Sequence, residues 1–404
     1  MNMQTNSSEL FTPFTLGSLT LKNRFLRAGC FEGMAQDGEV TEKLINHHED
    51  QAKGGIAMTT VGYCAVSKDG RGFGNELYMR DDLEEPLSIL VKRVHENGAA
   101  ASIQLVHCGY FSSPEVIGKK TLGASKQFCT FRFSFCEEMT ISQIEEKTMD
   151  FIYSAKMAKK AGFDAVEIHG GHGYLLSQFL SPFTNRRKDQ YGGSLENRIR
   201  FITEVVSGIK KEVKNLAVLV KINQFDGMKK GIELEDSIKI AQALEKAGAD
   251  AIIPSCGFTS KTPFMMLRGN LPIKEMSRNQ KSLFMRVSMT LFGRLFVQYY
   301  KYSQLFLLDG AKQIAKNVNI PVIYIGGVLS GKDAQTAIDN GCTAVQIGRA
   351  QIMDSDFVNR LKNKTIEIST CDHCNRCIGA MDAGGVYCVT KQEESHQQED
   401  THPK

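Results

Sequence analysis

Five segments of the chain repeat one design, in which a polar helical stretch ends at a glycine and an apolar run follows. The glycines at these junctions are Gly55, Gly98, Gly162, Gly248 and Gly341. Glycine suits the left-handed turn that closes a helix, and a continuous apolar run is typical of a strand buried on both faces. The chain is therefore expected to alternate helices with parallel strands.

Three further apolar runs, at residues 23–28, 216–223 and 320–327, raise the number of expected strands to eight. Eight such strands predict an α/β fold, a (β/α)8 TIM barrel over residues 1–360. An open doubly wound sheet is the alternative, which is weakened because no strand leads directly into G-x-G-x-x-G. The length of 404 residues suits one barrel with insertions. Residues 361–404 would form a C-terminal extension that carries a cysteine cluster and ends in a disordered tail.

The charge pattern argues against nucleic acid as a partner. The chain has 49 Lys+Arg and 45 Asp+Glu, for a formal net charge of +4, without a long basic run. The most lipid-like stretch, residues 283–308, is interrupted by Arg286, Arg294 and Lys301, so no membrane span is expected and an amphipathic insertion is preferred. The N-terminus lacks the apolar core of a secretory signal, which predicts a cytoplasmic protein.

Polar side chains gather where the expected strands end: Gln104, His107, His169, His172, Tyr174 and Lys221. Because parallel barrel strands all end at one face, these side chains predict a common pocket for a small-molecule substrate. For His107, the sequence favours neither a structural nor a catalytic role over the other. Two irregular stretches, residues 110–140 and 257–319, follow strand ends and are expected to form lids or substrate loops on the same face.

The last two strands end in IGG, with Gly326 and Gly327, and in IGR, with Gly348 and Arg349. Glycine amides can approach phosphate oxygens closely and an arginine adds charge-assisted hydrogen bonds, so this end of the barrel predicts a phosphate site. A phosphate site alone does not indicate which reaction the protein catalyses. A non-redox aldolase or isomerase therefore stays open, with Lys221 as a Schiff-base lysine.

Three segments carry a resemblance to a known family: LKNRFLRAG at residues 21–29, IQLVHCG at 103–109 and EIHGGHGYLLSQFLSPFTNRRKDQYGGSLENRIRF at 167–201. The last combines H-x-x-H-x-Y, S-P-x-x-N-x-R and Y-G-G-S-x-x-N-R in that order. The chain resembles the old yellow enzyme and 2,4-dienoyl-CoA reductase group of FMN flavoproteins, the NADH:flavin oxidoreductases. The part from Asn185 to Arg198 is expected to be structural.

The resemblance implies FMN as cofactor, NAD(P)H as hydride donor and an ene-reductase that works by ping-pong hydride transfer. His169 and His172 would hold the oxygen of an α,β-unsaturated carbonyl, while Tyr174 would give a proton to the α-carbon. The implied FMN-binding residues are Ala28, Gly29, Cys30, Tyr63, Gln104, Lys221, Gly327, Gly348 and Arg349. A flavin-dependent amine dehydrogenase is the alternative within the family.

Four of the 11 cysteines form C-x2-C-x2-C-x10-C: Cys371, Cys374, Cys377 and Cys388. This spacing predicts a four-iron cluster or a tetrahedral zinc, with unligated thiols as the third possibility. The longer branch of the family implies [4Fe-4S], fed by a C-terminal domain with a second flavin. The sequence ends at Lys404, so such a cluster would be structural or would need an electron-donor protein. Zinc could instead stabilise a partner-binding module, and a second copy of the chain is a further candidate partner.

Overall fold

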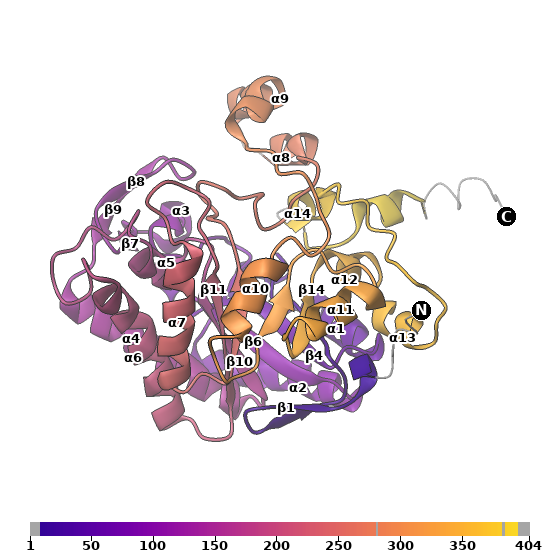
Figure 1. Cartoon of the computed structure of the whole chain (residues 1–404). Coiled ribbons are helices and arrows are strands. Elements are labelled where there is room, and N and C mark those ends of the chain that lie inside the picture. Colours follow the sequence, from indigo (N-terminus) through magenta and orange to yellow (C-terminus); the bar gives the residue numbers. More distant parts are fainter. Residues whose placement is uncertain (1–8, 280–281, 382–383, 395–404) are drawn as a thin grey trace.

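A computed structural model describes residues 9–279, 282–381 and 384–394. The residues predicted to form a disordered tail lie mostly outside these ranges. Eight parallel strands surround the centre of the molecule, with helices on the outside (Figure 1). These strands are β3 (Phe25–Arg27), β4 (Met58–Ala65), β6 (Ala100–Val106), β10 (Ala165–Gly170), β11 (Ala217–Asn223), β12 (Ala251–Ser255), β13 (Ile323–Ile325) and β14 (Ala344–Ile347).

The sheet closes on itself. Hydrogen-bonded neighbours run in the order β12, β11, β10, β6, β4, β3, β14 and β13. Its two ends meet at a parallel bridge between Ile252 and Val322, next to a hydrogen bond of 3.0 Å from the Ile252 amide to the Pro321 carbonyl. The predicted barrel is therefore confirmed, and the open-sheet alternative is wrong.

Helices separate the strands and bury an apolar face against them. Those that cover the barrel are α1 (Glu42–Lys53), α2 (Glu84–Glu96), α4 (Ile141–Lys160), α6 (Leu195–Glu212), α7 (Leu234–Lys246), α10 (Leu308–Ala315), α11 (Gly331–Asp339) and α12 (Arg349–Met353). The longest, α4, starts with a capping box in which Thr140 and Gln143 satisfy each other's backbone amides. Its far end is followed by Gly162 at φ 94°, as the repeated sequence design predicts.

A short hairpin, β1 (Phe14–Leu16) with β2 (Leu19–Leu21), blocks the amino-terminal end of the barrel. Phe14, Leu16 and Leu21 share one buried cluster with inward-facing strand residues such as Leu26 and Leu219. This apolar plug fills the lower barrel with side chains. A ligand can therefore enter only at the carboxyl ends of the strands.

Both predicted insertions lie at that open end. The first holds α3 (Pro114–Ile117) and a small sheet of β7 (Leu122–Gly123), β8 (Gln127–Cys129) and β9 (Ser134–Glu138). The second holds α8 (Ile273–Arg278) and α9 (Leu283–Phe296), which stand clear of the barrel in Figure 1. Two shorter elements, β5 (Leu77–Tyr78) and α5 (Leu175–Leu180), complete this face.

The chain after the barrel returns to the same end through α13 (Phe357–Lys362) and α14 (Arg376–Ala380). The Asn270 amide donates to the His373 carbonyl at 3.0 Å, and the Val386 amide donates to the Glu32 carbonyl at 2.8 Å. The extension is thus fastened to the barrel and to the second insertion. The boundary at residue 360 stays a prediction. Among the described residues, no helix combines the length and the apolar character needed to cross a bilayer.

Candidate functional site

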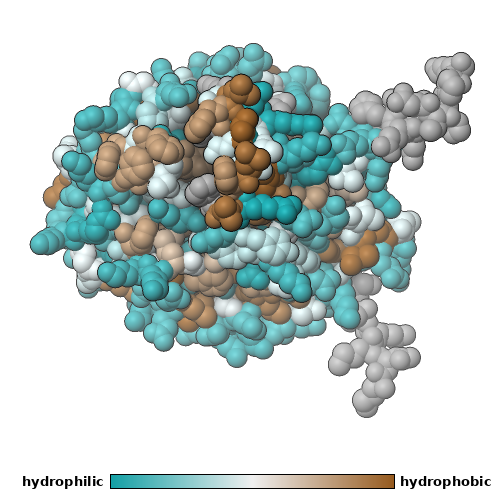
Figure 2. Space-filling view, turned by 90° about the horizontal axis from the view of Figure 1, so that it is seen from above, coloured by the Kyte–Doolittle hydropathy of each residue, from teal (hydrophilic) through white to brown (hydrophobic). Residues whose placement is uncertain are grey.

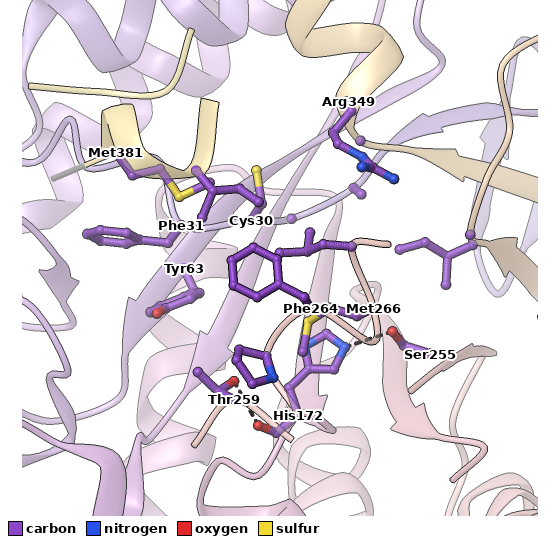
Figure 3. A pocket seen from close by; sticks show the side chains of 18 of the residues that line it. Cys30, Phe31, Tyr63, His172, Ser255, Thr259, Phe264, Met266, Arg349 and Met381 are labelled. Atoms are coloured by element: carbon purple, nitrogen blue, oxygen red, sulfur yellow. Dashed lines mark hydrogen bonds between the residues drawn. The ribbon is translucent and has the colours of Figure 1, made fainter. Parts of the chain in front are cut away.

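A cavity of about 420 Å³ opens at the carboxyl ends of the strands (Figure 3). Its volume lies within the range of small-molecule sites, about 300–1,000 Å³. The structure brings all twelve predicted catalytic and cofactor-binding residues to its walls: Ala28, Gly29, Cys30, Tyr63, Gln104, His169, His172, Tyr174, Lys221, Gly327, Gly348 and Arg349. These residues come from seven strands or the loops that follow them, which explains why they are scattered in the sequence.

Strand β10 and the loop after it place two histidines beside a tyrosine. The His169 ring lies 4.9 Å from the His172 ring and 4.7 Å from the Tyr174 ring, centre to centre. The Tyr174 hydroxyl forms a hydrogen bond of 3.1 Å with the Tyr63 hydroxyl from β4. The two imidazole rings and the Tyr174 hydroxyl therefore face one region of the cavity. The Tyr63 phenol lies next to that hydroxyl and is hydrogen-bonded to it.

His172 has an unusual backbone conformation, with φ at 58°. Left-handed backbone costs roughly 1–2 kcal/mol for a residue with a side chain, so neighbouring groups must hold it. The His172 amide donates to the Asn223 side chain at 3.0 Å, and its carbonyl accepts from the Thr259 hydroxyl at 2.9 Å (Figure 3). Its ring Nε2 lies 2.7 Å from the Ser255 hydroxyl. The orientation of this ring is therefore set by two neighbouring strands, β11 and β12, and a loop.

Burial keeps both histidines neutral. It lowers the pKa of His172 to about 3 and that of His169 well below its ordinary value, and the Lys221 ammonium lowers both further. The His169 Nδ1 atom accepts from the Gly171 amide at 3.3 Å, which leaves the proton of the neutral ring on Nε2. Burial also raises the pKa of Tyr174, so that its phenol keeps its proton. The site therefore offers neutral hydrogen-bond donors.

A buried polar layer lies between the cavity and the apolar plug. The Glu167 carboxylate is completely buried and forms a salt bridge of 2.6 Å with Lys221. The side-chain amides of Gln104 and Gln346 also donate to it, the latter at 2.6 Å. Four strands are tied together through this one carboxylate. The network fixes Gln104 and Lys221 at the cavity wall.

The far side of the cavity has the features of a phosphate cradle. Gly326 and Gly327 have positive φ of 120° and 73°, a backbone that exposes peptide groups. At Gly348 a side chain would meet no atom within 4 Å, so open space lies in front of the backbone. Arg349 lines the same space, where its guanidinium donates to the Asn375 side chain at 2.7 Å. A phosphate therefore has both room and a cation here.

One buried acceptor in the cavity wall lacks a partner. The Oε1 atom of Gln346 is buried and accepts no hydrogen bond from the part of the chain that the structure describes. An unsatisfied buried acceptor costs roughly 1–3 kcal/mol unless a ligand or water satisfies it. Together with the glycine cradle and the amide of Gln104, it makes the cavity fit FMN, whose ring carries donors and whose tail carries a phosphate.

His107 has a structural position. Its Nδ1 accepts from the Gly109 amide at 3.0 Å, and its Nε2 lies 3.6 Å from the Asp69 carboxylate. Asp69 also pairs with Lys147 at 3.2 Å. His107 does not line the cavity. Of the two roles open to it from the sequence, the structure supports the structural one.

The segment from Asn185 to Arg198 has a structural role, as expected, because it stabilises the loop that follows β10. The Asn185 amide donates to the carbonyls of Phe179 and Tyr191, both at 2.7 Å. Arg198 donates to the Leu180 carbonyl at 2.9 Å. These side chains satisfy buried backbone groups of the segment that follows β10, and thereby hold the histidine loop in place.

The four clustered cysteines line a second cavity next to Arg349. Cys388 Sγ lies 3.1 Å from the Met353 sulfur, and Cys374 Sγ lies 3.9 Å from the Thr390 hydroxyl. Within residues 9–279, 282–381 and 384–394, no three His, Cys, Asp or Glu side chains are grouped to hold a metal. The iron-sulfur or zinc site at Cys371, Cys374, Cys377 and Cys388 therefore stays a prediction.

Sequence reasoning missed the apolar walls of the cavity. These walls are made of aromatic and thioether side chains from separate loops and from the C-terminal extension: Phe31, Phe73, Phe131, Phe264, Met266, Met276, Met289 and Met381. It also missed Gln346. A polar residue inside the apolar run AVQIG was a usable signal, whereas loop residues without periodic spacing give none.

The fold and this cavity define a barrel enzyme with a site for a phosphate-bearing cofactor. The model of the family described as NADH:flavin oxidoreductase / NADH oxidase matches residues 9–262, and the chain belongs to this family. It is a flavin oxidoreductase that uses NADH or NADPH, and its barrel has the fold of an old yellow enzyme homologue. The sequence resemblance is thereby confirmed.

Three known proteins show the extent of the similarity. A 4,4'-dithiodibutanoate disulfide reductase from Rhodococcus erythropolis is 34% identical, and the alignment covers 95% of each chain. An NADH oxidase from Thermoanaerobacter brockii is 31% identical over 93% of this chain but only 54% of its own length. The solved structure of an old yellow enzyme homologue from Zymomonas mobilis superimposes with a TM-score of 0.71 at 21% identity, covering 90% of this chain and 95% of its own.

Proposed function

We propose that the protein reduces the activated C=C bond of α,β-unsaturated carbonyl compounds with NAD(P)H. The observation that carries this proposal is the pair of neutral histidines beside a protonated tyrosine. Hydrogen bonds to a carbonyl oxygen polarise the conjugated alkene and make its β-carbon the better hydride acceptor. A phenol at the same site suits protonation of the α-carbon.

The cofactor residues would act as follows. The loops with Gly327 and Gly348 would hold the FMN phosphate with Arg349, and Gln104 would bind the flavin pyrimidine ring. Lys221 would stabilise negative charge near that ring. FMN held by these residues would supply hydride transfer from NAD(P)H to the substrate.

The chain's own groups would then complete the reaction. His169 and His172 hold the carbonyl oxygen while the π bond opens and a C–H bond forms at the β-carbon. Tyr174 gives its proton to the α-carbon, and the Tyr63 hydroxyl, 3.1 Å away, provides a path for its replacement. The net change is one alkene and NAD(P)H plus a proton giving the saturated carbonyl and NAD(P)+.

A comparison of electron acceptors tests this proposal. The purified enzyme is assayed anaerobically with 2-cyclohexenone and with 4,4'-dithiodibutanoate as oxidants of NAD(P)H, and with histamine as a reductant of the flavin. The expected result is the highest kcat/KM for the enone. The disulfide is the second candidate, because the relative from Rhodococcus erythropolis, which matches 95% of this chain, is named as a reductase of that compound. A higher kcat/KM for the disulfide or the amine would overturn the proposal.

Gly348 provides a test of the cofactor cradle. A Gly348→Ala substitution should weaken FMN binding at least about tenfold, because the added methyl group occupies space where the phosphate would approach. Titration of the apoprotein with FMN measures the affinity. Gly74→Ala is the matched control, since that glycine also faces open space but lies outside the cavity. Equal FMN affinity in both variants would show that the phosphate binds elsewhere.

The pKa values predict a flat pH profile between pH 5 and 7 for alkene reduction by the prereduced enzyme. A histidine with the ordinary pKa of about 6.5 would gain a proton across this range, whereas His169 and His172 stay neutral. A step centred near pH 6.5 would contradict the neutral-histidine arrangement.

A further inference from the structure

The helical hairpin of α8 and α9, defined as residues 273–279 and 282–296, exposes more apolar side chain than a free surface normally shows. The exposed fractions are 75% for Leu283, 78% for Phe284 and 79% for Leu295, with Val287 and Leu291 at 50% and 67%. Contiguous exposed apolar patches mark surfaces that bind a partner or a membrane. Figure 2, which looks down on this end of the molecule, shows apolar side chains gathered there.

These side chains form one stripe along α9. Leu283, Val287, Leu291 and Leu295 follow each other at intervals of four residues, which places them on one face of the helix. The opposite side packs on α8, where Gly293 lies close to Ile273 and the Ser277 hydroxyl bonds the Thr290 hydroxyl at 2.7 Å. The exposed stripe is therefore the free face of a packed hairpin.

The same protrusion is strongly cationic. Between residues 276 and 308 the sequence has no Asp or Glu. Lys274, Arg278, Arg294 and Lys301 are exposed, and none of them forms an ion pair with the described part of the chain. Glu275, the acidic residue of α8, shares Arg376 with Glu393, at 2.7 and 2.6 Å, and Glu393 also attracts Lys274 and Arg278 without pairing with them. An apolar stripe bordered by cations is the pattern of a helix that lies in the surface of an anionic membrane.

A second apolar protrusion stands on the same end of the barrel. The β8–β9 hairpin exposes Phe128, Phe133 and Phe135, and Phe133 has an exposed fraction of 80%. The neighbouring Phe131 reaches the site cavity, as do Met276 of α8 and Met289 of α9. Both protrusions thus border the mouth of the cavity, and a surface that bound them would face that mouth.

We propose that the α8–α9 hairpin docks the enzyme on an anionic lipid surface, with the mouth of the site cavity turned toward the lipid. A second copy of the chain fits this surface less well. A two-fold interface would bring the same four cations opposite each other. The docking inference depends on the exposed stripe and its charges, and it stands apart from the choice of substrate.

Vesicle flotation tests the inference on the full-length, FMN-loaded enzyme. Vesicles of phosphatidylcholine with phosphatidylglycerol are compared with vesicles of phosphatidylcholine alone. The wild type should float with the anionic vesicles and lose most of this binding at high salt. A Leu291→Glu, Leu295→Glu double variant should lose at least tenfold of the bound fraction. An Ile89→Glu, Met149→Glu variant is the matched control, because these exposed residues of α2 and α4 lie on the side of the barrel.

FMN content confirms that each variant is folded. Binding by the wild type and the control, but not by the hairpin variant, supports the inference. Absence of wild-type binding, or equal binding by all three proteins, would overturn it. Light scattering adds one more outcome: a dimer that the hairpin substitutions dissociate, without vesicle binding, would show that a second copy covers the stripe.

Discussion

Replacing Tyr174 with phenylalanine should slow alkene reduction by the prereduced enzyme about 100-fold or more, the usual contribution of a positioned general acid. The reason is that the substitution removes the only proton of this side chain that faces the histidines, while the ring that packs against His169 remains. Reduction of the flavin by NAD(P)H needs no such proton and should keep its rate. Stopped-flow measurement of the two half-reactions separates these effects.

Two other tyrosines serve as controls for this substitution. Tyr63→Phe should have a smaller effect, because its hydroxyl stands behind that of Tyr174. Tyr110→Phe removes a buried hydroxyl that bonds Ser260 and does not line the cavity, so both half-reactions should continue normally. If Tyr174→Phe reduces alkenes as fast as Tyr110→Phe, another group is the proton donor.

Replacing Lys221 with methionine should lower the free energy of unfolding by about 3–5 kcal/mol, because it leaves the buried Glu167 carboxylate without its cation. FMN binding should weaken as well, since Lys221 lines the cofactor cavity. Urea unfolding of the apoprotein and FMN titration measure the two effects separately. Lys156→Met, which breaks an exposed ion pair with Glu212, should leave the unfolding midpoint unchanged.

A second substitution distinguishes the effect of the unpaired buried charge from the effect of the changed side-chain shape. In the Lys221→Met background, Glu167→Gln removes the uncompensated charge and keeps an acceptor for Gln346, although its NH2 group then faces the Gln104 amide, which must turn over to accept from it. Part of the stability should return, and the FMN affinity should stay low. If Lys221→Met alone is as stable as the wild type, the buried pair does not hold the strands in the way described here.

The barrel could be predicted because the patterns that indicate its helices and strands each lie within a short stretch of sequence. Five helices are followed by a glycine such as Gly162 or Gly248, whose positive φ favours that residue, and each strand is a short apolar run. The residues at strand ends could be grouped for the same reason, since parallel strands all place their carboxyl ends on one face. The family motif then assigned roles to His169, His172 and Tyr174.

Other features depend on contacts that no local pattern reveals. Glu167 stands in an apolar run, and its partners Gln104, Lys221 and Gln346 are distant in sequence and meet it only when the barrel closes. The hairpin of α8 and α9 was expected only as an amphipathic insertion, because its apolar stripe indicates a helix without indicating what the helix covers. The metal site that the spacing of the four cysteines predicts stays a prediction, because the described residues show no group of side chains arranged to hold a metal.

In the proposed reaction, hydride reaches the β-carbon and a proton reaches the α-carbon of an unsaturated carbonyl compound. A single anaerobic turnover with 2-cyclohexenone and NAD(P)H that carries deuterium at its transferable position tests this directly, with the product analysed by NMR. We expect cyclohexanone with deuterium on the β-carbon and hydrogen from solvent on the α-carbon. Oxidation of NAD(P)H without any saturated ketone, or deuterium on the α-carbon, would contradict it.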